Sequence, residues 1–379
     1  MEPGLARKNT CIMIELNIDI LIDVMIQIDS QRDISRMSRT CHSLHKFACQ
    51  ELLRRGVYLS TKRGLLSFYR FISNIGHTTR LLRQLSISMD LCKKFKRFSG
   101  LIARIIIFCA EVEEFTLERG YLLDADIRIG AAICTLQQLR TLEISWLGGV
   151  QNANIILSNL QSASLEAVHL TYHRFFDRLP SNDRDPTDGL HGFSASLTSL
   201  SLDAANFRVP NVDTPVCPQL TTLKLLECNT TGVAFLMYAF PNLRNLLLYG
   251  SDDYAPEDLD DDDAHFALTR VIPWKNLDYL TGSPHVVHSL RIPCPVYHWD
   301  VSLLSHYGEV DYLILAIEDL RVTQLALDLH REELQRFTAL ANSQALTHLV
   351  LTVEVKGSSE GEIGEYQVRS GRVDVYVLH

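Results

Sequence analysis

The sequence predicts an α/β solenoid: a curved parallel sheet with helices on its convex side, preceded by a separate helical module. The first observation is a recurring sequence motif, which we call the phrase: an aliphatic residue, any two residues, a second aliphatic, any one residue and a third aliphatic. The others are the helical spacing between these phrases and the different pattern of residues 1–60. Units that bury their apolar edges only against neighbours stack into a solenoid. The phrase begins at Leu82, Val112, Leu139, Leu165, Leu197, Leu220, Leu243, Val322 and Leu346.

The spacing of the phrases sets the length of one repeat. From Leu82 to Leu243 the successive steps are 30, 27, 26, 32, 23 and 23 residues. Leucine-rich repeats have a period of roughly 20–29 residues, so the two longest steps indicate insertions. The sequence therefore predicts an irregular leucine-rich-repeat solenoid over residues 61–356, with insertions at 179–191 and 251–264.

Beyond residue 248, more phrases fit the pattern than successive strands allow. Pro284–Leu290 and Glu309–Leu320 are therefore predicted as helices, because each lies too close to a better-spaced phrase. Residues 357–379 are predicted to form a loop that ends in a strand at Val373–Leu378. The strands of this region are predicted to begin at Leu277, Val296, Val322 and Leu346.

Segments with helical spacing of apolar residues separate the strand phrases. Strand and helix therefore alternate, which is the pattern of a parallel sheet with helices packed against it. The predicted helical segments are Leu101–Ala110, Ile127–Leu136, Ile155–Leu160, Val233–Phe240 and Phe266–Ile272.

The composition argues against several classes of partner. The 379 residues carry a formal net charge of −9, which disfavours a broad phosphate-binding face and hence nucleic acid. The apolar stretch 12–28 contains Glu15, Asp19 and Asp23, and a carboxylate costs about 2.5–3.5 kcal/mol inside a bilayer. We therefore expect no spanning helix and no membrane partner. The nine cysteines form no C-x-x-C pair, which favours reduced thiols and a location in the cytoplasm or nucleus.

Candidate catalytic and metal-binding motifs are weak. The sequence contains no G-x-S-x-G, H-E-x-x-H or G-x-G-x-x-G motif, so we predict neither an enzyme nor a cofactor. Two histidine pairs have the spacing of metal ligands, but neither has a cysteine or carboxylate nearby at the spacing of a zinc site. We therefore predict structural or surface histidines and no metal site. These pairs are His169 with His173 and His285 with His288. The acidic run 252–263 lacks the glycine of an EF-hand loop, so a solvated loop is favoured over a docking site for a basic partner.

The concave side of the sheet is the predicted binding face. Side chains alternate along a strand, so residues that flank the last two aliphatics of each phrase point away from the core. Large rings, and an outward Leu247 beside Tyr249, are typical anchors for a protein ligand. An ordinary solvated face is the alternative interpretation. The predicted contacts with a protein partner are Glu114, Glu118, Glu143, Trp146, His169, Tyr172, Lys224, Leu247 and Tyr249.

The periodicity of the N-terminal segment leaves its secondary structure open. Mostly β-branched residues alternate from Ile14 to Ile28 as in a strand, whereas Leu16, Ile20 and Val24 are spaced like one face of a helix. The order of the whole segment decides for helices, because it resembles a known family over about 45 residues.

That family is the F-box, which the segments Leu16-Asn-Ile-Asp-Ile-Leu21, Asp33-Ile-x-x-Met37 and Thr40-Cys-x-x-Leu44 resemble in type and order. The chain departs from the motif at three positions: Asn17 replaces a proline, Thr40 a valine and Leu44 a tryptophan. Asn17 is itself a good residue to begin a helix.

The resemblance implies three short helices over residues 1–60 that expose an apolar face to a Skp-type adaptor and, through it, a cullin–RING ligase. By similarity, the adaptor contacts would be Leu16, Ile20, Leu21, Ile34, Met37, Cys41 and Leu44. The whole chain is similar to F-box/leucine-rich-repeat proteins of the fungal type, which are substrate receptors of SCF-type ubiquitin ligases. The alternative is a ubiquitin-independent repeat scaffold, in which the N-terminal segment faces inward and caps the solenoid.

Overall fold

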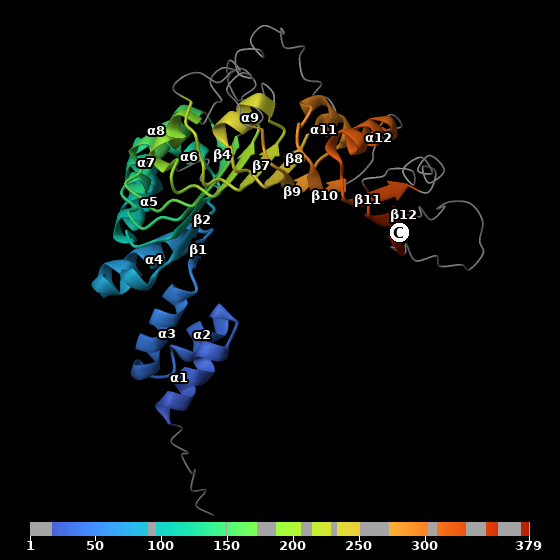
Figure 1. The fold of residues 1–379 in the computed structure, drawn as a ribbon. Coiled ribbons are helices and arrows are strands. Elements are labelled where there is room, and N and C mark those ends of the chain that lie inside the picture. The colour runs from blue at the N-terminus through green and yellow to red at the C-terminus, as the bar shows by residue number, and fades with distance from the viewer. Residues whose placement is uncertain are drawn as a thin grey trace, which may run out of the picture.

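A computed structural model of the protein shows a long curved sheet whose strands follow one another in chain order (Figure 1). Neighbouring strands are parallel from β1 to β12, and β13 runs antiparallel to β12. The predicted parallel solenoid is therefore confirmed. The structure describes residues 17–89, 96–148, 150–172, 187–205, 214–228, 233–250, 273–301, 309–330, 346–354 and 373–378. The strands are β1 Val57–Leu59, β2 Gln84–Ile87, β3 Glu114–Leu117, β4 Thr141–Leu147, β5 Ala167–Tyr172, β6 Ser199–Asp203, β7 Thr222–Leu226, β8 Asn245–Tyr249, β9 Leu277–Thr281, β10 Val296–Val301, β11 Gln324–His330, β12 His348–Glu354 and β13 Val373–Leu378.

Helices cover the outer side of the curve and leave the inner side of the sheet open (Figure 1). The helices predicted at Pro284–Leu290 and Glu309–Leu320 are α11 and α12 with the same bounds. The segment Phe266–Ile272 and the acidic run 252–263 lie outside the described residues. The other elements of the convex side are α4 Lys62–Ile75, η1 Gly76–Leu81, α5 Lys96–Phe108, α6 Tyr121–Ala125, α7 Ile127–Cys134, α8 Val150–Asn159, η4 Thr187–Phe193 and α9 Val233–Ala239.

The second and third aliphatics of each phrase form a continuous spine behind the sheet. Leu142, Val168 and Leu200 are register partners on three successive strands, and each is buried. Burying one such side chain contributes about 1.5–3 kcal/mol. One connected core therefore runs from Leu53 to Leu327, and each repeat gains its stability from the two repeats beside it.

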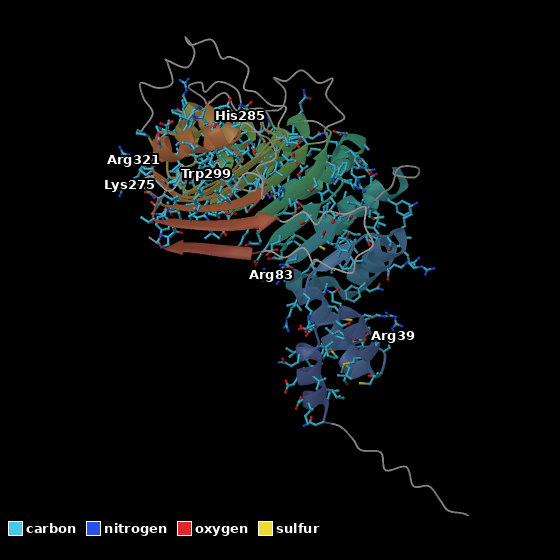
Figure 2. The ribbon with its side chains drawn as sticks, turned by 90° about the vertical axis from the view of Figure 1, so that its right-hand side faces the viewer. Arg39, Arg83, Lys275, His285, Trp299 and Arg321 are labelled. Carbon is cyan, nitrogen blue, oxygen red and sulfur yellow. The ribbon has the colours of Figure 1, made fainter. Side chains whose placement is uncertain are left out.

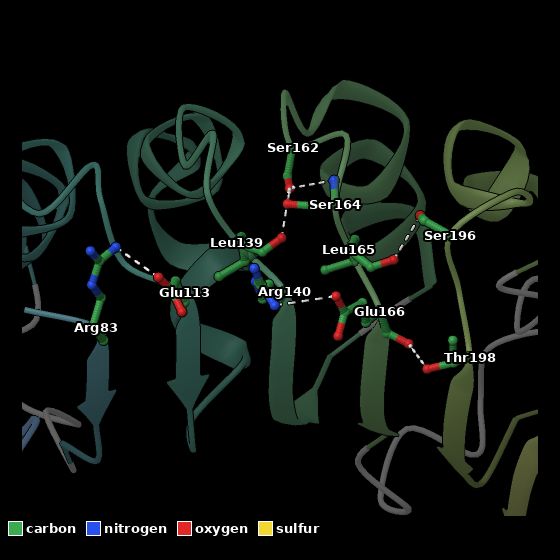
Figure 3. Close-up of polar contacts among 10 residues, drawn as sticks. All are labelled: Arg83, Glu113, Leu139, Arg140, Ser162, Ser164, Leu165, Glu166, Ser196 and Thr198. Carbon is green, nitrogen blue, oxygen red and sulfur yellow. Dashed lines mark hydrogen bonds and ion pairs between the residues drawn. The ribbon is translucent and has the colours of Figure 1, made fainter.

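Polar contacts also link each repeat to the next, where the chain enters the strands (Figure 3). The Ser162 hydroxyl donates to the Leu139 carbonyl at 2.6 Å, and the Ser196 hydroxyl donates to the Leu165 carbonyl at 2.8 Å. Exposed ion pairs join neighbouring repeats as well. Each adds at most about 1 kcal/mol to the free energy of unfolding, so these pairs fix the register of the strands more than they stabilise the fold. They join Arg83 to Glu113 at 2.7 Å, Arg140 to Glu166 at 3.5 Å and Arg244 to Asp278 at 3.7 Å.

The N-terminal module consists of three helices, α1 Ile18–Gln27, α2 Gln31–Met37 and α3 His42–Arg54. It projects below the N-terminal end of the solenoid (Figure 1). The side chain of Asn17 accepts a hydrogen bond from the Asp19 backbone N–H at 2.9 Å, so the residue that replaces the proline begins α1 as expected. The helical interpretation of this segment is confirmed.

Two predicted boundaries need correction. The strand β1 starts at Val57, before the boundary drawn at residue 60, because Leu59 belongs to the solenoid core. Of the insertion predicted at 179–191, residues 187–191 belong to the 3₁₀ helix η4 rather than to a loop. Leu190 is buried in the solenoid core, so η4 fills the helical half of its repeat. Residues 357–372 lie outside the described part of the chain, and the strand predicted at Val373–Leu378 is β13.

Candidate interaction surfaces

The first surface is an exposed aliphatic face on α1. Ile20 and Val24 lie one helical turn apart and are 53% and 45% exposed. Ile18 and Ile26 on the same helix are also exposed, and so is Phe47 on α3. Isolated exposed aliphatics are common, but Ile20 and Val24 share one side of α1 and form a small apolar face that favours a binding partner. Ile18 and Ile26 lie on other sides of the helix.

The module owes its shape to a small core of its own. Met25, Ile34, Leu44 and Ala48 form this core, and it is a cluster separate from that of the solenoid. The two cores meet at α3, where Leu53 turns toward the solenoid. The module is thus built on the end of the solenoid without being buried in it.

The predicted adaptor contacts divide into buried and exposed residues. Ile34 and Leu44 are buried in the module's core, so they can support the face but do not lie on it; this corrects the prediction. Leu21 and Met37 are half-buried against the same core. The exposed members of the set are Ile20 and Cys41, and Leu16 lies outside the described residues.

The exposed residues Ile18, Val24, Ile26 and Phe47 were missing from the predicted contacts. The alternating isoleucines that resemble a strand carried the signal. In a helix, residues two apart are separated by about 200°, so an alternating run places aliphatics on opposite sides. Leu21, Ile22 and Met25 face the module's core. The run therefore leaves aliphatics at the surface on more than one side of α1, with Ile20 and Val24 on one side and Ile18 and Ile26 away from them.

The second surface is the concave face of the sheet, which is acidic at β3 and β4. Glu114, Glu118 and Glu143 all lie there, as predicted, and none is paired with a lysine or arginine in the described ion pairs. Glu143 accepts a hydrogen bond from the Thr116 hydroxyl at 3.2 Å, and His169 Nδ1 lies 3.9 Å from its carboxylate.

Two aromatic residues near the ends of β4 and β5 were predicted to lie on the binding face, but one is exposed and the other is buried. Trp146 is exposed, its φ of 63° is in the left-handed region, and the Arg119 guanidinium lies 5.2 Å from its ring centroid. Tyr172 is only 4% exposed and belongs to the solenoid core, which corrects its assignment to the binding face. Alternation explains the difference, because Leu170 and Tyr172 are two apart and share one side of β5.

Aromatic side chains gather on the concave face from β8 to β10. Tyr249 is exposed beside the half-buried Leu247, with Lys224 Nζ 5.4 Å from its ring centroid. On the next strands, the rings of Tyr279 and His298 stack at 5.3 Å. This group extends the predicted Leu247–Tyr249 pair by two strands.

Hydrogen bonds hold these rings in place. The Tyr279 hydroxyl donates to the Asp300 carboxylate at 3.0 Å, and burial raises the pKa of this hydroxyl, which keeps it a donor. Tyr297 is 53% exposed, and its hydroxyl accepts from the Gln324 amide at 3.0 Å. The predicted contact set ended at Tyr249, but the same alternation rule applied to β9 would have found Tyr279.

Candidate metal sites are not found in the described part of the chain. No group of three histidine, cysteine or carboxylate residues there could hold a metal ion. His285 and His288 both contact the ring of Tyr312, at centroid distances of 5.0 and 5.5 Å. The partner of His169 in the other histidine pair, His173, lies outside the described residues. No helix among the described residues combines the length and apolar character needed to cross a bilayer.

Comparison with known proteins gives a structural likeness only. No family model matches the sequence, and no curated protein matches it. A chain of the crystal structure of the Rad7 and Elc1 complex in yeast is similar in structure. The two share 17% sequence identity, the match covers 90% of this chain and 87% of that chain, and the TM-score is 0.38. At these values the likeness says nothing about partners or activity.

Proposed function

We propose that this chain is the substrate-recognition subunit of an SCF-type cullin–RING ubiquitin ligase. In this proposal α1–α3 bind a Skp-type adaptor, and the concave face binds the protein to be ubiquitinated. The chain performs no bond chemistry itself and needs no cofactor. It raises the effective concentration of a substrate lysine near a conjugating enzyme that another subunit carries, in the cytoplasm or nucleus.

The single observation that carries the proposal is the aliphatic face of α1. The segment that resembles the F-box in sequence forms three helices with a core of their own, and Ile20 and Val24 stay exposed. A short helix that keeps such residues in water gains free energy when a partner covers them. The exposure also argues against an inward-facing cap, which would bury Ile20 and Val24 against the solenoid.

The concave face supports the second half of the proposal. The group Tyr249, Tyr279 and Tyr297 offers large rings at β8–β10, held by contacts with Lys224 and Asp300 among others. Rings that are already ordered lose little conformational entropy when they bind a protein surface. A substrate bound there would lie in the hollow of the arc, on the side of the sheet opposite to the helices (Figure 1).

The adaptor assignment is tested by co-expression of the chain with a Skp-type adaptor and measurement of their co-purification. Val24→Asp places a charge in the aliphatic face, so we expect at least about a tenfold loss of affinity. Val24 is the better target than Leu21, because Leu21 packs against the module's core and its replacement would also unfold α1.

Ile127→Asp on α7 is the matched control. Ile127 is 78% exposed and lies on the convex side of the solenoid, so the same chemical change there should leave adaptor binding intact. Circular dichroism should show both variants folded. If the parent chain does not co-purify with the adaptor, or if Val24→Asp binds as tightly as Ile127→Asp, the assignment is wrong.

A further inference from the structure

The first two long helices of the convex side, α4 and α5, are basic and contain no carboxylate. Together they carry Lys62, Arg63, Arg70, Lys96, Arg97 and Arg104 and not one Asp or Glu. The chain as a whole has a net charge of −9. The two helices lie at the N-terminal end of the solenoid (Figure 1), so their six positive charges gather at that end of a chain that is otherwise acidic.

On α4 the charges border an apolar residue on one exposed side of the helix. Arg63, Leu66, Ser67 and Arg70 are spaced three or four residues apart, and together they line an open hollow. All four are exposed. A ligand at this hollow would meet two guanidinium groups with an aliphatic side chain between them.

The helix α5 continues the same surface. Arg104, Ile107 and Phe108 are exposed on one side of α5, and the ring of Phe108 lies 6.2 Å from that of Tyr69 on α4. We call Arg63, Leu66, Arg70, Arg104 and Phe108 the α4–α5 patch. The Tyr69–Phe108 contact joins its two halves into one surface.

The arginines of the patch form no ion pair within the described part of the chain. None of its ion pairs involves Arg63, Arg70 or Arg104. Three carboxylates of neighbouring elements are engaged elsewhere. Glu51 pairs with Arg55, Glu113 with Arg83 and Asp126 with Arg128.

We propose that the α4–α5 patch binds an acidic segment of a partner protein that also carries apolar side chains. The arginines complement its carboxylates, and Leu66 and Phe108 receive its apolar residues. The patch lies on the convex side, away from the concave face, so both surfaces can be occupied at once. This inference does not depend on the adaptor assignment.

An anionic bilayer would offer similar charges, but the net charge of the chain disfavours it. A membrane extends along the whole molecule and would repel its excess of carboxylates. A short acidic segment feels mainly the charges within about 8 Å at physiological salt, which are those of the patch.

The test measures fluorescence anisotropy of a labelled peptide, Asp-Asp-Glu-Leu-Asp-Glu-Phe-Asp-Asp, titrated with the full chain. We expect binding that weakens as salt is added, and a loss of about tenfold or more in Arg63→Glu/Arg70→Glu. Leu66→Gln should weaken binding as well, and a peptide with Ser in place of Leu and Phe should bind less tightly. Arg104→Glu, a single change on the other helix, provides a second variant should the double variant fail to fold.

Lys275→Glu/Arg321→Glu is the matched control, because it changes the net charge equally at exposed positions near the other end of the solenoid (Figure 2). It should bind the peptide like the parent. The proposal is overturned if the parent does not bind the peptide, or if the control loses as much affinity as the patch variants. Binding to vesicles of phosphatidylcholine with phosphatidylserine in place of the peptide would also overturn it, in favour of a membrane ligand.

Discussion

Cys228 shows how single residues of this chain meet the demands of the repeat. It lies three positions after Leu225, where a standard leucine-rich repeat has an asparagine or a cysteine. Its thiol donates to the Leu202 carbonyl of the preceding repeat at 3.4 Å, and burial raises its pKa to about 12. A neutral thiol can therefore serve as the donor that links two repeats at this position.

The other described cysteines differ sharply in exposure, which leads to a prediction. Cys41 is exposed, whereas burial raises the pKa of Cys109 to about 12 and that of Cys217 and Cys294 to about 11. Alkylation requires an accessible thiolate. N-ethylmaleimide should therefore label Cys41 well before these three in the native protein, and all four equally in denaturant, as measured by mass spectrometry. Early native labelling of Cys109 would contradict the packing of α5.

Residue-level prediction from the sequence succeeded where alternation is regular. Glu114, Glu143 and Lys224 lie on the concave face because one rule gives the direction of every second side chain in a strand. The same rule places Tyr172 in the core, on the side of Leu170, but the prediction assigned Tyr172 to the binding face without applying the rule there. The rule could not predict Tyr297, because strict alternation fails in β10: two consecutive residues lie on the open face between the buried Val296 and Trp299.

At the level of elements, most strands and helices of the solenoid follow from the sequence. The phrase predicts strands because each strand of the solenoid needs two buried aliphatic residues two positions apart. Leu223 and Leu225 are such a pair. The helix α4 was not predicted, because it precedes the first phrase and the repeat had not yet been defined there. Tertiary packing decided α1, whose alternation alone favours a strand.

The start of α7 is stabilised by one carboxylate with two roles. Asp126 accepts from the Arg128 backbone N–H at 3.0 Å, and the Arg128 guanidinium lies 2.6 Å from its carboxylate. The hydrogen bond from the Arg128 side chain, more than any other interaction, holds the pKa of Asp126 well below its usual value. The helix begins here because the carboxylate satisfies a free N–H of its first turn.

Asp126→Ala should lower the free energy of unfolding by about 1–2 kcal/mol, because it removes the cap. Asp126→Asn should cost less, since asparagine caps equally well and only the pairing with Arg128 is lost. The folded pKa lies below the unfolded value of about 3.9, so this pairing stabilises the fold above that value and is lost as pH falls. The difference between parent and Asp126→Asn in urea unfolding should shrink from neutral pH to about pH 3; a constant difference would contradict the role given to the charge.

At the level of the whole molecule, two cores of different size are joined in series. The solenoid core links each repeat to its neighbours, whereas the module's core consists of four buried residues: Met25, Ile34, Leu44 and Ala48. The sequence anticipated this division, because the phrase begins only after the module. It did not place the junction, since α3 supplies Leu52 to one core and Leu53 to the other.

Separate cores predict separate responses to matched cavity mutations. Leu44→Ala and Leu200→Ala remove the same atoms from fully buried sites, and each should cost about 2–5 kcal/mol locally. In hydrogen–deuterium exchange followed by mass spectrometry, Leu44→Ala should raise exchange in α1–α3 and leave β5–β7 protected. Leu200→Ala should do the reverse, with the effect fading along the sheet, because repeats couple only to their neighbours. If either substitution raised exchange equally in both regions, the module and the solenoid would fold as one unit, and the proposed adaptor binding at α1 would then be coupled to the stability of the concave face.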